Sequence, residues 1–366
     1  MRIAIVQHVS AGYYSEYLSS LIDEAAANAG YQIKTWSNSI PVFNQHIPDD
    51  AVVYIYIENT GAFTLKWWYA VKLTSILKKI NARVVFDLNG MVSPAKIPQL
   101  IAIDQNIRAE KNILLNATSK VANKNFEESI QHSRQIIIYS ENKKQAFNKK
   151  DESVKNKLQV IRFTAPENFR KFEWHEKIMI KATHADNNEY FLSILKDDDE
   201  ENFVLLLRAF SKFKKWQQSS MKLLLLPKYE AFEKYIFEKL KTYKYRDDVR
   251  LLENLEETQL ISVVASAHSF VHISSSFADL MVLAIALQCA LPVITDKNAD
   301  IEEYIGNAAL YVKEKSVDYL GDALINLYKD ENLHTQLKEA AEKQATIFKR
   351  EEYKTKLWQL IQAAHV

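Results

Sequence analysis

The sequence is poor in glycine, in cysteine and in long apolar runs. Six glycines in 366 residues fall far below the usual share of about 7%, which is unusual for a phosphate-binding chain because phosphate-cradling loops normally use glycine. The sequence holds no phosphate-loop lysine motif, no nucleophile elbow and no His–Glu zinc helix. Its single cysteine, Cys289, excludes an internal disulfide framework and a thiolate zinc cluster.

The apolar residues do not form a membrane span. No apolar run approaches the roughly 20 residues that a spanning helix needs, and the first residues lead directly into a strand-like segment without a signal-peptide pattern. We therefore expect a reduced, cytoplasmic protein. The 47 Lys and Arg nearly cancel the 46 Asp and Glu, a net charge of +1, which argues against a general nucleic-acid binder.

Charge is unevenly distributed along the chain. Up to Ala165 there are 20 basic and 14 acidic residues, a net +6, which leaves a net −5 for the rest. A basic first half suits contact with an anionic surface at the inner face of the membrane, or with an acidic acceptor. An ordinary solvated surface explains the basic excess equally well. The aromatic and basic segment Leu65–Lys72 is compatible with peripheral membrane contact, although we favour a helix packed on a sheet.

The length suits two domains, and strand-like and helical segments alternate in both halves. Helical periodicity marks 13–29, 65–80, 202–216, 278–288 and most of 317–364. Apolar strand-like runs lie at 3–6, 31–36, 52–57, 83–86 and 135–139, and then at 190–195, 222–226, 249–252, 270–273 and 292–295. Apolar strands separated by helices predict an α/β protein with parallel sheets covered on both faces.

A polar stretch separates the two alternating sets. We place a linker at about 166–188, an N-terminal Rossmann-like domain at 1–170 and a C-terminal Rossmann-like domain at 186–349. The last helix, about 350–366, has apolar residues on one side.

Several motifs in the second half occur in the order of one known family. They are a strand and helix at Tyr190–Leu195 and Asn202–Phe210, the strand Phe270–Ser275, the segment Ala286–Ile294, which is similar to "AMACGVPVI", and Ile301–Leu310. This half resembles the donor-binding half of family 4 (group 1) glycosyltransferases, which have the GT-B fold. In the first half, Gly12, Tyr17–Leu21 and Gly30–Ile33 resemble the opening of that family.

The resemblance implies an architecture and a division of labour. It implies two Rossmann-like domains facing a central cleft, with the C-terminal helix returning to the N-terminal domain. The nucleotide sugar would bind to the second half, and a glycan or lipid-linked acceptor to the first. Ligands bind beyond the carboxyl ends of strands in such sheets. The resemblance implies no cofactor and no metal, because the fold normally supplies the charge stabilisation.

The sequence departs from the family where the donor binds. Two glutamates that contact the sugar and the ribose in the family correspond to Phe277 and Ile285. The family glycines between them correspond to Ala278 and Leu280, which impairs close backbone approach to a phosphate.

The diphosphate clamp of the family is also altered. Its arginine and lysine correspond to Lys196 and Glu201, and the residues between these positions are Asp197-Asp198-Asp199-Glu200. A run of carboxylates opposes a dianionic leaving group. Asp197 and Asp199 have the spacing with which another glycosyltransferase class holds a divalent cation, but a solvated loop is the usual meaning of such a run.

The candidate site residues follow from strand ends and from the resemblance. On the acceptor side they are His8, Gly12, Tyr13 and Asn89, with Asp87 as the general base, although turn formation explains Asp87 equally well. On the donor side they are Lys196, Ser274, Ser275, Ser276, Asp279, Glu302 and Glu303. The three serines could equally cap a helix, and the two glutamates could be ordinary surface residues.

These observations favour a glycosyltransferase that moves a sugar from a nucleotide donor to a glycan or lipid-linked acceptor. Two alternatives remain open: a catalytically degenerate binding or partner subunit, and a GT-B enzyme of another family with a different donor.

Overall fold

The computed structural model of the chain describes residues 1–9, 13–36, 47–58, 62–103, 127–195, 200–227, 230–253, 255–273 and 279–365. The chain divides into two compact units. Unit 1 comprises Met1–Phe163 and Lys349–Val366, and unit 2 comprises Thr164–Phe348. Among the described residues, no helix has both the length and the apolar character needed to span a bilayer.

Unit 1 is built on a sheet whose described strands are all parallel, in the order β2-β3-β1-β4-β5-β6-β7. The central strands are buried runs of apolar residues, which confirms the sequence interpretation. The short strands β5 and β7 were not predicted. The bounds are β1 Arg2–His8, β2 Gln32–Thr35, β3 Ala51–Ile57, β4 Val84–Asp87, β5 Gln99–Ala102, β6 Gln135–Ile138 and β7 Leu158–Val160.

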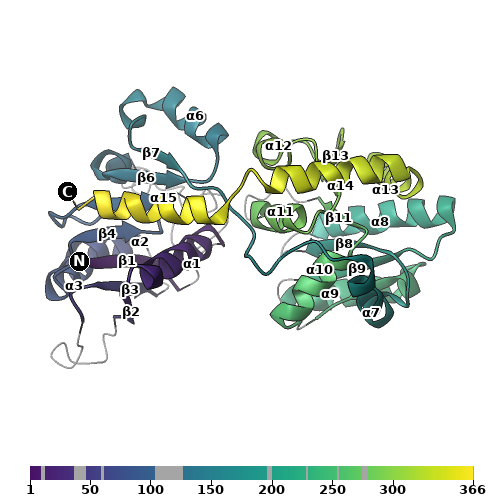
Figure 1. Cartoon of the computed structure of the whole chain (residues 1–366), viewed down its shortest axis with the longest axis horizontal. Coiled ribbons are helices and arrows are strands. Elements are labelled where there is room, and N and C mark those ends of the chain that lie inside the picture. The colour runs from purple at the N-terminus through teal and green to yellow at the C-terminus, as the bar shows by residue number, and fades with distance from the viewer. Residues whose placement is uncertain are drawn as a thin grey trace. The chain divides into compact units, whose positions relative to one another are not determined.

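Helices cover both faces of this sheet (Figure 1). A nearly continuous helix of α2, η2 and α3 packs on the face that carries Val53 and Ile55. Tyr54 points to the other face, where its hydroxyl donates to Asp23 of α1 at 2.7 Å. The bounds are α1 Tyr13–Asn28, α2 Ala62–Trp67, η2 (a π-helix) Trp68–Leu73, α3 Thr74–Lys79, α6 Glu141–Lys150, η4 (a 3₁₀ turn) Glu152–Val154 and α15 Arg350–Ala363.

Unit 2 holds a second sheet whose described strands are also all parallel, in the order β10-β9-β8-β11-β12-β13. Its strands are β8 Tyr190–Leu195, β9 Lys222–Pro227, β10 Val249–Leu251, β11 Ser269–His272, β12 Val293–Asp296 and β13 Ala309–Val312. Its helices are α7 Trp174–Ala185, α8 Glu200–Gln217, α9 Glu230–Lys241, η5 Arg246–Asp248, α10 Glu257–Ser266, α11 Asp279–Gln288, α12 Ala299–Ile305, α13 Val317–Lys329 and α14 Glu331–Ala345.

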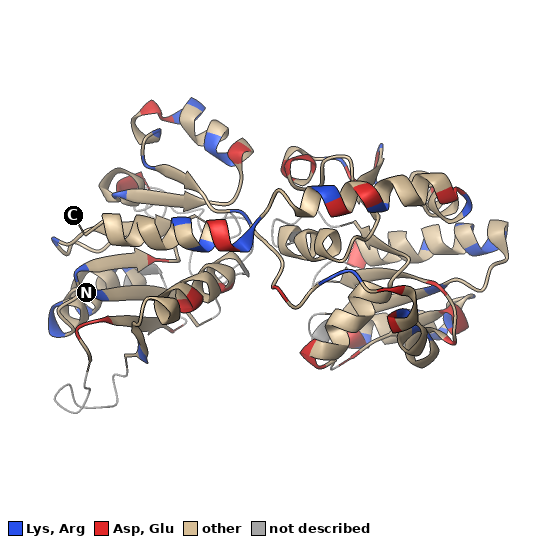
Figure 2. Cartoon of the chain, in the orientation of Figure 1, with Lys and Arg blue, Asp and Glu red and all other residues tan. Residues whose placement is uncertain are grey.

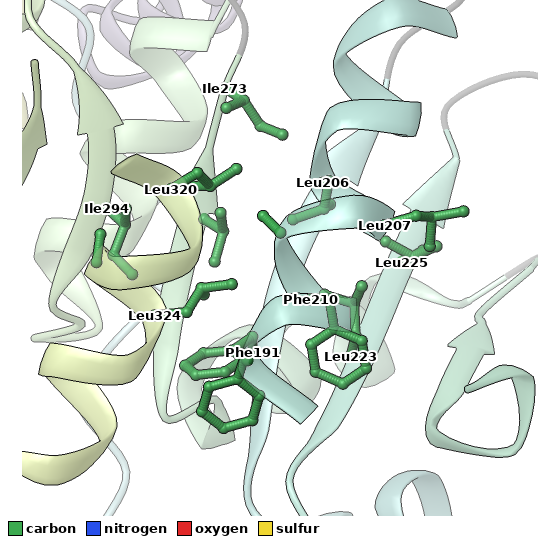
Figure 3. Close-up of a cluster of buried hydrophobic side chains, with 14 of the residues drawn as sticks. Phe191, Leu206, Leu207, Phe210, Leu223, Leu225, Ile273, Ile294, Leu320 and Leu324 are labelled. Atoms are coloured by element: carbon green, nitrogen blue, oxygen red, sulfur yellow. The ribbon is translucent and has the colours of Figure 1, made fainter. Parts of the chain in front are cut away.

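The core of unit 2 lies between one face of the sheet and the helices α8 and α13. Figure 3 shows Leu206 and Phe210 of α8 turned toward Leu320 and Leu324 of α13, above strand residues such as Phe191. These side chains are at most 1% exposed, and fully burying one aliphatic or phenyl side chain stabilises a fold by about 1.5–3 kcal/mol.

The structure tests the expected positions of the C-terminal helix and of the linker between the domains. The expected return of the C-terminal helix is confirmed, because α15 belongs to unit 1. The expected linker over 166–188 is wrong for residues 174–185, which form helix α7 of unit 2. Only Ala185 of this helix is buried, so the segment is an exposed helix of unit 2 and not an extended connection.

Candidate functional site

Asp87 lies at the carboxyl end of β4 and is 1% exposed. The Tyr69 hydroxyl donates to its Oδ2 at 2.6 Å, and the backbone N–H groups of Asn89 and Met91 donate to its Oδ1 at 2.8 and 3.0 Å. Burial raises the pKa of Asp87 to about 7, and these hydrogen bonds oppose the rise. The carboxyl group therefore organises the turn after β4, and its raised pKa is also one that suits a general base.

Asn89 and His8 join the same network. Asn89 Nδ2 donates to the Val6 carbonyl and to the Tyr69 hydroxyl, both at 3.3 Å, and the His8 N–H donates to Asn89 Oδ1 at 3.0 Å. Burial lowers the pKa of His8, which keeps its ring neutral. The structure thus brings three predicted residues, His8, Asp87 and Asn89, together at the carboxyl ends of β1 and β4.

The positions of two other acceptor-side residues, Gly12 and the side chain of Tyr13, are not described by the structure. Gly12 lies outside the described residues, and Tyr13 begins α1 but its side chain is not among those described.

Sequence reasoning missed a group of basic side chains at the same edge of the unit 1 sheet. Lys356 of α15 donates to the carbonyl of Val160, the last residue of β7, at 3.1 Å. Burial lowers the pKa of Lys356, the charges of Lys144 and Arg162 lower it further, and Glu141 raises it. These three cations come from α6, from the segment after β7 and from α15. The basic excess of the first half was a signal for Lys144 and Arg162 only, and no sequence signal pointed to Lys356.

Most predicted donor-side residues fall outside the described part of the chain. Lys196, Ser274, Ser275 and Ser276 are not described, and neither is the side chain of Asp279, with which α11 begins. These residues follow β8 and β11, which are neighbours in the sheet. Their assignment to the donor stays a prediction.

The two predicted glutamates are described. Both belong to α12, where Glu302 is exposed and pairs with Lys297 at 3.0 Å, and Glu303 is half-buried. The structure therefore places Glu302 in a surface ion pair, and its predicted contact with a donor also stays a prediction.

Polar side chains that the sequence interpretation did not single out occupy the strand ends of unit 2. His272 and Thr295 are buried neighbours on β11 and β12, and His272 Nδ1 shares a hydrogen bond of 2.9 Å with Thr295 Oγ1. Asp296 ends β12, with Lys315 Nζ 3.9 Å from its Oδ2. Polar residues inside otherwise apolar strands were the signal that could have identified them.

The segment similar to "AMACGVPVI" has a distinctive backbone. Ala290 stands at the family glycine and has φ of +55°, in the left-handed region. Ile285, at the position of a family glutamate, is a 9% exposed residue of α11.

Within the described part of the chain, no group of three or more His, Cys, Asp or Glu side chains could hold a metal ion.

Comparison with known proteins identifies this unit. Residues 175–344 match the family described as glycosyl transferases group 1. Unit 2 is thus similar to the group 1 glycosyltransferases over these residues. The matched residues lie within unit 2 and include the whole of its sheet.

Solved structures show that the whole chain has the GT-B fold. WaaG, a glycosyltransferase involved in lipopolysaccharide biosynthesis, is 14% identical with a TM-score of 0.72, and 99% of each chain is covered. The sucrose-phosphate synthase of Thermosynechococcus elongatus is 16% identical with a TM-score of 0.71, covering 99% of this chain and 98% of its own. Anabaena Alr3699/HepE, solved with UDP-glucose, is 12% identical with a TM-score of 0.71, covering 99% and 100%. No curated protein sequence matches the chain.

Proposed function

We propose that this glycosyltransferase moves a sugar from a nucleotide-sugar donor to a glycan or lipid-linked acceptor, as a step of polysaccharide biosynthesis. The donor would bind to unit 2 and the acceptor to unit 1. The observation that carries the proposal is the match of residues 175–344 to the group 1 glycosyltransferases. Anabaena HepE, which shares the fold, was solved with UDP-glucose, so a UDP-sugar is the first donor to test.

The polar strand ends of unit 2 support a donor site there. In open parallel sheets, ligands bind beyond the carboxyl ends of the strands, and His272, Thr295 and Asp296 lie at two of these ends. Lys196 would meet the diphosphate, and backbone amides near Ser275 would add donors for its oxygens. We expect no divalent metal to be required.

The basic group of unit 1 supports an acidic acceptor. Lys144 and Arg162 both lower the pKa of Lys356, and a phosphate or carboxylate of the acceptor bound beside Lys356 would favour its charged form. Asp87 would serve as the general base, with the proton of the acceptor hydroxyl as its target.

Calorimetric titration with UDP, GDP, ADP and their sugar conjugates tests donor binding. We expect one nucleotide to saturate a single site and Lys196→Ala to weaken it at least tenfold. Lys215→Gln is the matched control, because Lys215 is an exposed lysine near the far end of α8. If no nucleotide binds, the chain is a degenerate partner subunit, and if Lys196→Ala binds as tightly as Lys215→Gln, the assignment of Lys196 is wrong.

A further inference from the structure

The helix formed by α2, η2 and α3 has one buried side and one exposed side. Its inner side places Trp68, Leu73 and Leu77 in the core against the sheet of unit 1. This packing is the arrangement favoured from the sequence. It leaves the function of the outer side to be explained.

The outer side carries apolar residues in its middle. Trp67 is 53% exposed and Val71, four residues on, is 51% exposed. Ala70 between them is exposed as well. Because residues four apart lie on the same side of a helix, Trp67 and Val71 form one continuous apolar strip on this outer side.

Lysines stand at both ends of this apolar strip, and acidic residues are missing from it. Lys66 precedes Trp67, and Lys78 and Lys79 end α3, all three exposed. The sequence from Asn59 to Phe86 contains five basic residues and no Asp or Glu. Figure 2 shows the basic end of α3 in blue.

Charges on neighbouring elements do not cancel this excess. Arg2 of β1 contacts the end of α3 through the carbonyl of Ile80 at 3.2 Å, and the same guanidinium pairs with Asp49 at 3.0 Å. Unit 1 as a whole contains 24 basic and 16 acidic residues, a net +8, whereas unit 2 has a net −7. The exposed strip therefore lies on the strongly basic unit.

We propose that this outer face docks unit 1 on an anionic lipid bilayer, with Trp67 and Val71 in the headgroup region and the lysines on anionic headgroups. A helix with aromatic and aliphatic residues flanked by lysine has the composition of an interfacial helix, and tryptophan is enriched at membrane interfaces. Protein interfaces, in contrast, are depleted of lysine. The proposal is independent of sugar transfer.

Co-sedimentation with vesicles tests the docking. The full chain is mixed with vesicles of phosphatidylcholine, or of phosphatidylcholine and phosphatidylglycerol, at low and high salt. We expect binding to the anionic vesicles alone, and weaker binding at high salt because salt screens the lysines. Each lysine near an anionic surface contributes about a fivefold gain in partitioning, so Lys66→Gln/Trp67→Ser should lose more than tenfold.

The chain offers a matched control. Lys215 and Trp216 form a second exposed Lys-Trp pair on α8 of unit 2, where Trp216 is 68% exposed. Lys215→Gln/Trp216→Ser should bind the vesicles as the wild type does, and thermal unfolding of both variants checks that they are folded. The single variant Lys78→Gln, with an expected loss of about fivefold, carries the test if the first double variant fails to fold. Failure of the wild type to bind anionic vesicles, or equal losses in the two double variants, would overturn the proposal and leave the nucleotide titration untouched.

Discussion

At the residue scale, Asp87 combines complete burial with a full set of hydrogen bonds. Its pKa rises from 3.8 to about 7 because burial disfavours the charged form. The folded protein therefore binds a proton at this site that the unfolded chain releases between about pH 4 and pH 7. Since stability falls with pH wherever the folded state binds more protons, ionisation of Asp87 destabilises unit 1 across this window.

Asp87→Asn should remove this pH dependence. The asparagine oxygen can still accept from the N–H groups of Asn89 and Met91, and its amide donates to Tyr69. We expect the free energy of unfolding of the wild type, relative to the variant, to fall by about 1.4 kcal/mol per pH unit between the two pKa values. Urea midpoints from pH 4 to pH 8 measure it. A constant difference between the two proteins would show that Asp87 is ionised throughout.

The same variant decides whether Asp87 also acts in the reaction. A general base contributes about 10²–10⁴-fold to a rate, so Asp87→Asn should lose at least a hundredfold in turnover at pH 8 if the sequence prediction holds. Unchanged turnover would leave Asp87 as the residue that organises the turn after β4.

At the element scale, the scarcity of glycine has a visible consequence at helix ends. Helices α1 and α11 end in the same hydrogen-bond pattern: Tyr31 N–H donates to Ala26 O at 2.8 Å, and Leu291 N–H donates to Ala286 O at 2.9 Å. This motif needs a left-handed residue, usually glycine. In α1 it is Gly30, at φ of +77°, whereas in α11 it is Ala290.

Ala290→Gly should relieve the strain at the end of α11. A left-handed alanine costs about 1–2 kcal/mol, and the change gives up about 0.8 kcal/mol of methyl burial together with some backbone entropy. We expect the free energy of unfolding to stay level or to rise by up to about 1 kcal/mol. Ala340→Gly, in the interior of α14, should instead lower it by about 1 kcal/mol. Equal losses in urea unfolding would contradict the strain.

The sequence predicted some strands and helices of the fold and missed others. The buried runs of β1, β3, β8 and β9 are apolar on both faces, which is a strong signal in a parallel sheet. Short strands were predicted only in part: β4 and β10 were identified, whereas β5 and β7, which are equally short, were missed. Helix α7 was missed because it lies within a stretch that is polar on both sides of it, and its apolar residues Trp174, Ile178 and Met179 are exposed and not part of a core.

The site was less predictable than the fold, for a physical reason. Asp87, Asn89 and His8 could be placed because each follows or ends an identifiable strand. Arg162 and Lys356 could not, because they are 194 residues apart in the sequence and only the packing of α15 brings them together. A site made of distant residues becomes visible only once the topology is known.

At the scale of the whole molecule, the last helix decides the stability of unit 1, although it follows unit 2 in the sequence. Trp358 of α15 is 8% exposed, and its ring meets Tyr31 edge-on at 5.1 Å between centroids. Arg350 at the start of the helix pairs with Glu24 of α1. Unit 1 therefore cannot complete its core until the end of the chain is present.

Trp358→Ala should destabilise unit 1 selectively. Removing a buried tryptophan costs about 3–5 kcal/mol, whereas Trp216→Ala, which removes an exposed tryptophan of unit 2, should change stability by less than about 0.5 kcal/mol. Hydrogen exchange by mass spectrometry separates the units: amides of β1 and β3 should exchange faster in Trp358→Ala, and those of β8 and β9 should keep their rates. If all four strands exchange faster together, the two units unfold as one, and the cores assigned to them are coupled in a single cooperative transition.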